Sequence, residues 1–397
     1  MLFHARALAS EGLDVDLIGT ETGELPAFIR DNPRIGVHAL ASATHGGADE
    51  SERRSLLAMF GRGLRLLFSL TRLLVWRLPA PGLILVQNPP GVPTMATAWL
   101  AARLRGARFA VDWHNLTSAM LEMRLGRGHA LVGLTARYEG LFGRAADVNL
   151  FVSSHMQHSL RERFRVSGHV FRDRPADIFV PLDDAERRRV RARVLTRFGG
   201  ATATEPALLV SATSWTADEN FDLLLEGLRR YDEHARLDSG SRLPSLAVLI
   251  TGSGPLKRAF KARASEQAME RVAIRTGWIE AGEYPRVMAA ADLGICCHTS
   301  ASGLDLPMKV TDMFGAGIPV CAYDYGPCLQ ELVHPGMNGV LFTTSEECCA
   351  QLERLLAGGP DSNASVAALR DGVRASATVS WSAGWAAEAR APLLGES

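Results

Sequence analysis

The sequence predicts an α/β protein made of two doubly wound domains, each with a parallel sheet covered by helices. Its 397 residues are too many for one hydrophobic core of ordinary size. Short apolar strand-like runs alternate with helical segments along both halves of the chain, which is typical of βα units. A composition of 47% hydrophobic and 22% charged residues is that of a folded globular protein.

Charge and cysteine usage narrow the classes of function. The 43 Lys and Arg residues balance the 43 Asp and Glu residues, so no overall field attracts nucleic acid. The six cysteines include two adjacent pairs, Cys296/Cys297 and Cys348/Cys349, and no pair has the C-x-x-C spacing of a metal site. We therefore expect reduced thiols and a cytosolic compartment. The segment Met1–Arg6 lacks the apolar run that a secretory signal needs.

The first domain, residues 1–182, begins in an unusual way. Leu2–Ser10 is predicted to be an amphipathic helix and Leu13–Gly19 a strand. A doubly wound domain normally opens with a strand and a Gly-rich turn before its first helix. Either the fold lacks this first strand or the strand lies upstream of Met1. We expect the second, because losing the strand would expose the edge of its neighbour.

A strand at Ile35–Leu40 is followed by the polar residues 41–55, which are predicted to form a flexible loop. The next element is an apolar helix at 64–78 that carries three arginines. Its apolar runs are too short for a membrane span, which needs about 20 residues. Two interpretations stay open: the helix faces the core, or it rests a basic and apolar face on a membrane surface.

Polar residues follow two buried strands of the first domain. Gln87 and Asn88 end one strand, and Asp112, His114 and Asn115 follow the next. Ligands of open α/β sheets lie at the carboxyl ends of the strands. His114 beside Asp112 is a candidate general base, because a carboxylate can orient the ring and support its charge. The alternative is a turn in which Asp112 and Asn115 cap the following helix.

The composition changes at residues 183–206, which form the predicted interdomain crossing. The crossing consists of a helical, arginine-rich part at 183–197 and a small-residue run at 199–206. A second βα series then begins, so the second domain is predicted to cover residues 207–365. The C-terminal helical segment, 366–397, is expected to pack back on the first domain, and its two tryptophans, four residues apart, are expected to make packing contacts.

Two glycine-containing loops of the second domain predict an anion site. After the strand Leu246–Thr251, Gly252 and Gly254 let the backbone approach a phosphate, and Lys257 lies within reach of its oxygens. A G-x-G segment alone is weak evidence for phosphate binding.

The second loop opens the stretch Ser302–Val320. Gly303 marks a loop, and Lys309–Phe314 is predicted to be a short helix whose N-terminal N–H groups suit a diphosphate. Lys309 adds a positive charge, and Asp312 lies on the same helix face, where its carboxylate can accept from ribose hydroxyls. Taken alone, this stretch is equally compatible with an ordinary loop–helix–strand unit. The two loops together predict one diphosphate site.

Seven segments carry a resemblance to a known family. They are Gln87-Asn-Pro-Pro-Gly-Val-Pro93, Asp112-Trp-His-Asn115, Tyr138-Glu-Gly-Leu-Phe-Gly-Arg144, Thr213-Ser-Trp-Thr216, Thr251-Gly-Ser-Gly-Pro-Leu-Lys257, Ala291-Asp-Leu-Gly294 and His298-Thr-Ser-Ala-Ser-Gly-Leu-Asp-Leu-Pro-Met-Lys-Val-Thr-Asp-Met-Phe-Gly315. They run in the family's order across nearly the whole chain, and the last is the most specific. With them the chain resembles GT-B glycosyltransferases, and most closely the β-1,4-mannosyltransferases that place the first mannose on chitobiosyl-diphospho-dolichol.

The resemblance implies two Rossmann-like domains that face each other across a cleft, with GDP-mannose in the second domain and dolichol-diphosphate-linked chitobiose at the first. The donor-binding residues that it implies are Thr213, Trp215, Gly252, Gly254, Lys257, Ser302, Gly303, Leu304, Lys309 and Asp312. The acceptor-binding residues are Gln87, Asn88 and Asn115. Because the donor is an α-glycoside and the product is β-linked, the reaction inverts the anomeric centre. His114, with Asp112, is then the expected catalytic base.

The resemblance also implies partners and a location. The implied location is the cytosolic face of the endoplasmic reticulum membrane, or a membrane-associated cytoplasmic location in a bacterium. The implied protein partners are other early mannosyltransferases of the same pathway. It implies no tightly bound cofactor and no structural metal site, although a divalent cation can assist the diphosphate.

The chain departs from the family at two places. The family's N-terminus carries a membrane anchor, a strand and a Gly-Arg-Ser-Pro-like turn, and this sequence begins just after that turn. Leu116-Thr-Ser-Ala119 stands where the family usually has Tyr-Gly-Tyr-Ser. Two alternatives therefore stay open. One is a GT-B hexosyltransferase with another sugar nucleotide or lipid-linked acceptor, and the other is a truncated, non-catalytic paralogue.

Overall fold

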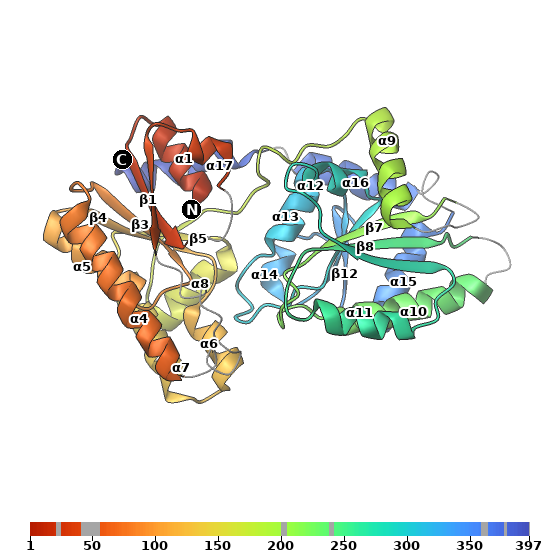
Figure 1. Ribbon diagram of the computed structural model, residues 1–397, viewed down its shortest axis with the longest axis horizontal. Coiled ribbons are helices and arrows are strands. Elements are labelled where there is room, and N and C mark those ends of the chain that lie inside the picture. Colours follow the sequence, from red (N-terminus) through yellow and green to blue (C-terminus); the bar gives the residue numbers. More distant parts are fainter. Residues whose placement is uncertain are drawn as a thin grey trace. The chain divides into compact units, whose positions relative to one another are not determined.

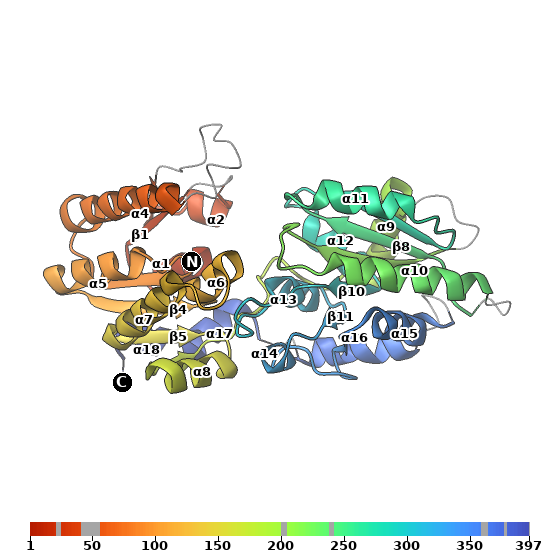
Figure 2. The ribbon, with the colours of Figure 1, turned by 90° about the horizontal axis from the view of Figure 1, so that it is seen from below.

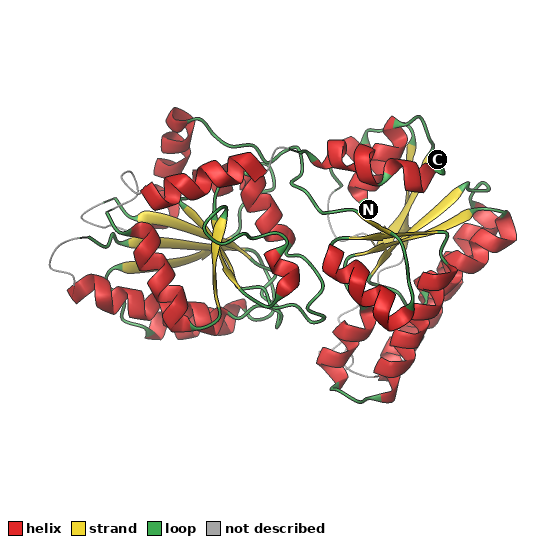
Figure 3. Cartoon of the chain, turned by 180° about the vertical axis from the view of Figure 1, so that it is seen from behind, coloured by secondary structure: helices red, strands yellow, loops and turns green. Residues whose placement is uncertain are grey.

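The computed structural model describes residues 1–20, 25–40, 56–199, 205–237, 242–358, 364–376 and 379–396. The predicted loop at 41–55 and most of the small-residue run at 199–206 lie outside these ranges. The chain divides into two compact units, Met1–Phe171 with Trp385–Ser397 and Arg172–Gly384. In each unit the strands lie at the centre and the helices lie around them (Figure 3).

The first unit contains two parallel ladders, β1–β2 and β3-β4-β5-β6, in that spatial order. Its elements are α1 (Leu2–Ser10), β1 (Val15–Thr20), α2 (Ala27–Arg30), β2 (Ile35–Leu40), α4 (Leu56–Thr71), η1 (Arg72–Arg77), β3 (Leu83–Asn88), α5 (Thr94–Arg105), β4 (Arg108–Trp113), α6 (Thr117–Leu125), α7 (Ala130–Ala145), β5 (Val148–Phe151), α8 (Ser154–Phe164), β6 (His169–Val170) and α18 (Arg390–Leu394). Within the described residues the two ladders are not joined by hydrogen bonds, and the expected first strand of this domain is absent from them.

The β3–β4 register brings the polar residues of the first unit to one edge. Gln87 is the partner of Asp112, and Asn88 is the partner of Trp113. Both strands run parallel, so their carboxyl ends meet at the same side of the sheet, as the sequence predicted.

Helix α4 and its π-helical extension η1 lie along α5 (Figure 2). Leu70 and Leu74 are buried, whereas Phe68 is 69% exposed and Trp76 is 72% exposed. The segment therefore faces the core on one side and presents large apolar side chains to solvent on the other, and contact of the exposed side with a membrane surface stays a prediction. Among the described helices, none is long and apolar enough to cross a membrane.

The second unit has one six-stranded parallel sheet in the order β12-β11-β10-β7-β8-β9. Its elements are α9 (Asp184–Val194), η2 (Leu195–Gly199), β7 (Ala207–Ala212), α10 (Phe221–Leu237), β8 (Leu246–Thr251), α11 (Lys257–Glu266), β9 (Val272–Gly277), α12 (Tyr284–Ala290), β10 (Leu293–Cys296), α13 (Met308–Gly315), β11 (Val320–Tyr323), α14 (Pro327–Gln330), β12 (Gly339–Phe342), α15 (Ser345–Leu356), α16 (Ala364–Ser376) and α17 (Trp381–Glu388), which ends in the first unit (Figure 1). β7, β8 and β10 are almost entirely buried, as expected for central strands covered on both faces. No disulfide links the six cysteines, all of which are described and buried.

The helical part of the expected crossing belongs to the second unit. Arg187 and Arg191 of α9 bind the buried carboxylate of Asp292 at 2.5 Å each, directly before β10. The Asp292 carboxylate also accepts from the backbone N–H of Leu208 in β7 at 2.8 Å. Removing either arginine would leave a buried charge poorly compensated, so these ion pairs hold α9 on the second sheet.

The unit boundaries also differ from the expected domain ranges. Residues 172–182 lie in the second unit rather than in the first, and residues 366–384 likewise belong to the second unit. From Trp385 onward the chain belongs to the first unit.

Candidate active site

The predicted general base of the first unit lies beside a buried carboxylate. Oδ2 of Asp112 lies 2.8 Å from Nε2 of His114 and 3.2 Å from Nε2 of His4. The Asp112 side chain is 1% exposed and the His114 side chain 25% exposed. The fold thus joins the two predicted residues and adds His4 of α1, which the sequence did not indicate.

Trp385 determines the protonation pattern of this cluster. Its indole N–H donates to Nδ1 of His4 at 3.1 Å, and an indole nitrogen can only donate. Neutral His4 therefore carries its proton on Nε2 and donates it to Asp112. Burial alone would raise the pKa of the Asp112 carboxyl, but the hydrogen bonds from His114 and His4, together with the positive charge of these rings when they are protonated, outweigh it and hold that pKa well below its ordinary value. Because ionised Asp112 also accepts from Nε2 of His114, the basic lone pair of neutral His114 is on Nδ1.

The N-terminus of α6 is capped by a residue other than Asp112. The buried carboxylate of Glu139, on α7, accepts from the backbone N–H groups of Thr117 at 2.6 Å and Ser118 at 3.2 Å. The alternative role of Asp112 as a cap of this helix is therefore wrong, and the Asp112 carboxylate is turned toward the histidines. Glu139 lies in the family-like segment 138–144, but nothing in the sequence showed which helix end it would reach.

The three predicted acceptor residues have different surroundings. Asn88 is fully buried, and its Nδ2 donates to the backbone oxygen of Asn115 at 3.0 Å and to Glu139 at 2.9 Å. A buried amide with these hydrogen bonds holds the turn together, and a role of Asn88 in acceptor binding stays a prediction. Gln87 and Asn115 are partly exposed, and Oδ1 of Asn115 accepts from the N–H of Leu116 at 2.7 Å.

In the second unit, Lys309 of α13 forms an ion pair with Glu219. The Glu219 side chain is 2% exposed and also accepts from the Thr213 hydroxyl and, at 3.1 Å, from the N–H of Trp215. The Lys309 side chain is 23% exposed, and the buried carboxylate of Glu219 holds its ammonium group near the carboxyl end of β7. Nothing local in the sequence indicated this pairing of Glu219 with Lys309, because it spans 90 residues.

A second cation of this unit is His298, which the sequence did not single out. Its Nε2 lies 2.9 Å from Asp305 and its Nδ1 lies 3.5 Å from Asp218. Burial lowers the pKa of His298, but the hydrogen bonds to Asp218 and Asp305 outweigh burial and raise this pKa to about 9. His298 is therefore an imidazolium ion at neutral pH. Its side chain is 12% exposed, so the charge is shielded from most solvent.

The two glycines of the predicted phosphate loop allow its backbone to pack closely against the loop that contains Thr213 and Ser214. A Cβ on Gly252, whose φ is +128°, would lie 1.8 Å from the backbone oxygen of Thr213. A Cβ on Gly254 would lie 1.8 Å from the backbone oxygen of Ser214. Lys257 folds back onto this loop, and its Nζ donates to the backbone oxygen of Gly252 at 2.8 Å.

The family-specific loop satisfies its own backbone donors. The N–H of Gly303 donates to the hydroxyl of Ser300 at 2.7 Å, and the N–H of Leu304 donates to the hydroxyl of Ser302 at 3.1 Å. Gly303 has a φ of +71°, a conformation that favours glycine. The N–H groups of Gly303 and Leu304 are thus engaged within the loop, and the positive charge beside it comes from side chains.

Two predicted donor residues differ sharply in exposure. Trp215 is fully buried, and its indole packs against Phe221 and Phe260, so its predicted role in donor binding is not supported by an exposed ring and stays a prediction. Asp312 is partly exposed on α13. Burial, with a smaller contribution from the charge of Asp173, raises the pKa of Asp312 to about 7.

Two family models match the two halves of the chain. One, described as a glycosyl transferase 4-like domain, covers residues 4–172, and the other, described as glycosyl transferases group 1, covers residues 205–358. The chitobiosyldiphosphodolichol beta-mannosyltransferase of Pongo abelii is 36% identical, over 97% of this chain and 87% of its own length. The chain belongs to the chitobiosyldiphosphodolichol β-mannosyltransferase family.

This member of the family is a glycosyltransferase with the GT-B fold. A relative from Arabidopsis thaliana, the UDP-glycosyltransferase TURAN, is 35% identical over 97% of this chain and 92% of its own length. A solved α,α-trehalose-phosphate synthase from Burkholderia vietnamiensis shares the fold, with a TM-score of 0.61 at 11% identity over 96% of both chains.

Proposed function

We propose that this glycosyltransferase moves mannose from GDP-mannose to a chitobiosyl-diphospho-dolichol acceptor and inverts the anomeric centre. The relatives from Pongo abelii, Mus musculus and Homo sapiens are named chitobiosyldiphosphodolichol beta-mannosyltransferases, which supports mannosyl transfer to this acceptor, and GDP-mannose is the donor that the family resemblance implies. The observation that carries the mechanism is the cluster at the end of β4, where buried Asp112 orients the partly exposed ring of His114. An inverting transfer needs a base of this kind on the acceptor side.

In the proposed step, Nδ1 of His114 takes the proton of the acceptor hydroxyl while the hydroxyl oxygen forms a bond to C1 of mannose. The bond from C1 to the diphosphate oxygen breaks in the same step, and GDP leaves with that electron pair. Asp112 stabilises the imidazolium ion that forms. His4 and Trp385 do not touch the substrate; they hold the Asp112 carboxylate in place.

On the donor side, the charge that develops on GDP needs cations that are already in position. Lys309, held by Glu219, and His298, held by Asp218 and Asp305, place cationic N–H groups in fixed positions near the carboxyl ends of the strands of the second sheet. Lys257 adds a third cation near Gly252. Asp312 is assigned to the ribose hydroxyls, and a divalent cation is assigned an assisting role at the diphosphate.

The proposed location is the cytosolic face of the endoplasmic reticulum membrane. The exposed side of α4 and η1 supports contact with a lipid surface, because Phe68 and Trp76 are accompanied there by exposed Arg65 and Arg72. Apolar side chains that enter the interface and arginines that meet anionic headgroups are the two components of peripheral binding.

The test is transfer to a phytanyl-diphosphate-linked chitobiose by the purified protein, with NMR of the product to read the new linkage. We expect a β-linked mannose from GDP-mannose, and loss of the product in His114→Gln. Because one relative is named a UDP-glycosyltransferase, parallel reactions contain UDP-glucose or UDP-N-acetylglucosamine. Turnover with a UDP-sugar and none with GDP-mannose would refute the proposal. A chelator reaction tests the assisting cation separately.

A further inference from the structure

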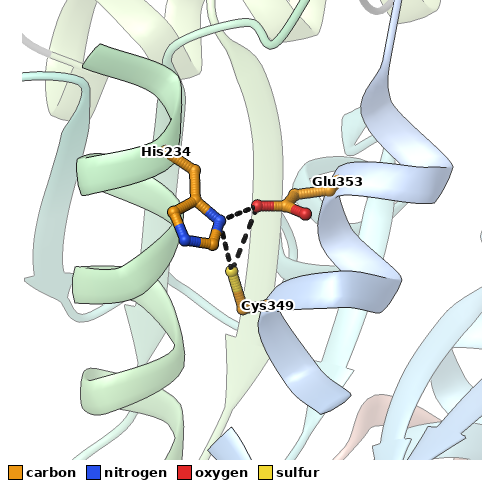
Figure 4. A group of neighbouring side chains, drawn as sticks. All are labelled: His234, Cys349 and Glu353. Carbon is orange, nitrogen blue, oxygen red and sulfur yellow. Dashed lines mark hydrogen bonds and ion pairs between the residues drawn. The ribbon is translucent and has the colours of Figure 1, made fainter. Parts of the chain in front are cut away.

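The strongest unassigned feature of the second unit is a cluster of three side chains on helices α10 and α15. His234 comes from α10, and Cys349 and Glu353 come from α15, where a separation of four residues puts them on one helix face (Figure 4). His234 lies thirteen residues beyond Phe221, the first residue of α10, which is about 20 Å along the helix axis. The residues that precede this end of α10 include Glu219, the partner of Lys309. The cluster is therefore separate from the groups assigned to catalysis.

The three donor atoms converge on one point. Nδ1 of His234 lies 2.5 Å from Oε1 of Glu353 and 3.9 Å from Sγ of Cys349, and Sγ lies 3.4 Å from the same Oε1 (Figure 4). Tetrahedral zinc with bonds of about 2.0–2.3 Å separates such donors by about 3.4–3.6 Å. Two of the three separations are already near this range. To admit an ion, the His234–Glu353 contact has to open by about 1 Å and the His234–Cys349 separation has to shorten by about 0.3 Å.

The exposure of the cluster allows an ion to enter. The side chains of His234 and Glu353 are 57% and 30% exposed, so both can rotate, whereas Cys349 is buried and fixes the base of the site. The solvent side is open for water as a fourth ligand. Imidazole, thiolate and carboxylate together are the donor set of a borderline divalent ion such as zinc.

A nucleophilic Cys–His–Glu triad is the obvious competing interpretation, and the geometry argues against it. A triad uses the two ring nitrogens separately, one for the nucleophile and one for the carboxylate. Here the thiol and the carboxylate both approach the same nitrogen, Nδ1 of His234 (Figure 4).

We propose that His234, Cys349 and Glu353 bind one zinc-class divalent ion that cross-links α10 to α15. This inference departs from the expectation of no structural metal site. Binding replaces the thiol proton by a metal–sulfur bond and releases that proton to solvent, so affinity falls as the pH is lowered. Since α10 and α15 pack on each other and contribute Leu224, Leu228 and Leu352 to the core, the ion stabilises the second unit rather than the transfer reaction.

The test uses cobalt(II) as a spectroscopic probe on the full chain after removal of metal by a chelator. We expect a thiolate-to-cobalt charge-transfer band and tetrahedral d–d bands that saturate at one equivalent. Cys349→Ser, nearly the same size, should lose the charge-transfer band, and His234→Gln should weaken binding about tenfold or more, which is 1.4 kcal/mol. His158→Gln is the control, because His158 pairs with Glu162 at 3.1 Å on the surface of α8.

A wild-type chain without the charge-transfer band, or a band that persists in Cys349→Ser, would overturn the proposal. A second measurement does not depend on that variant. Zinc at a hundredfold excess over its dissociation constant should multiply the folded-to-unfolded ratio of the second unit by about 100 and raise its melting temperature. Glu353→Gln, which keeps the side-chain size, should reduce this rise, and an unchanged wild-type melting temperature would also overturn the proposal.

Discussion

Replacement of His298 by Gln tests whether this residue is a built-in cation of the second unit. The pKa of His298 is raised from 6.5 to about 9, because the hydrogen bonds to Asp218 and Asp305 outweigh its burial. A group that binds its proton more tightly in the folded state stabilises that state fully below its unfolded pKa. The contribution is complete below pH 6.5, declines as the pH rises, and is lost above pH 9.

The size of this contribution follows from the two pKa values. Each pKa unit corresponds to 1.36 kcal/mol, so the shift of His298 gives about 3 kcal/mol at most. The side chain is 12% exposed, so little of this is lost to solvent screening. In His298→Gln, the free energy of unfolding of the second unit should lose this pH-dependent component between pH 6.5 and pH 9.

The assay is urea unfolding at several pH values from 6 to 10, with peptides of β7 and β8 followed by pulsed hydrogen-exchange mass spectrometry. These peptides report on the second unit separately, which matters because a chain with two units need not unfold in one step. His158→Gln, which removes a surface histidine of the first unit, should leave the profile of the wild type. If His298→Gln keeps the same slope between pH 6.5 and 9 as the wild type, the charged state of His298 is refuted.

Three further changes test other parts of the two sites. Asp112→Asn should lower kcat by roughly 10²–10⁴-fold with little change in donor KM, because the uncharged amide no longer holds His114 in the required tautomer. A change confined to donor KM would contradict this role of Asp112. Gly254→Ala should destabilise the second unit in urea unfolding, because its Cβ would lie 1.8 Å from the backbone oxygen of Ser214, and wild-type stability would show that the two loops can separate at little cost. Asp312→Ala should raise donor KM, and in the wild type donor KM should fall as the pH rises through about 7, where the Asp312 carboxyl ionises; unchanged donor kinetics would refute its ribose role.

The elements that the sequence predicted well are those whose pattern is local. The strands at Ile35–Leu40 and Leu246–Thr251 and the helix at Leu2–Ser10 have the predicted bounds. Apolar periodicity and glycine or proline at the ends were sufficient for them. The predicted interdomain crossing had a local pattern too, an arginine-rich helix, but its place depends on the ion pairs with Asp292, which lies about 100 residues away.

The residues whose surroundings the sequence did not indicate are mostly those whose burial depends on packing. Trp215 follows a strand end, as a ligand-binding residue does, yet its ring enters the core beside Phe221 and Phe260. Asn88, predicted to bind the acceptor, is buried and donates from its Nδ2 to Asn115 and Glu139. The position of a residue after a strand end can be recognised in the sequence. Whether its side chain points into the core or toward the ligand site cannot.

The sequence by itself determined the α/β class, the family and the placement of Asp112 beside His114, because these depend on short-range periodicity, on continuous segments and on residues two positions apart. The tertiary structure alone decided which partners complete the two sites. His4 and Trp385 meet across 381 residues, and Lys309 meets Glu219 across 90. The physical reason is that the charge state and orientation of a buried group are set by the groups packed around it, and for these residues those groups come from distant parts of the chain.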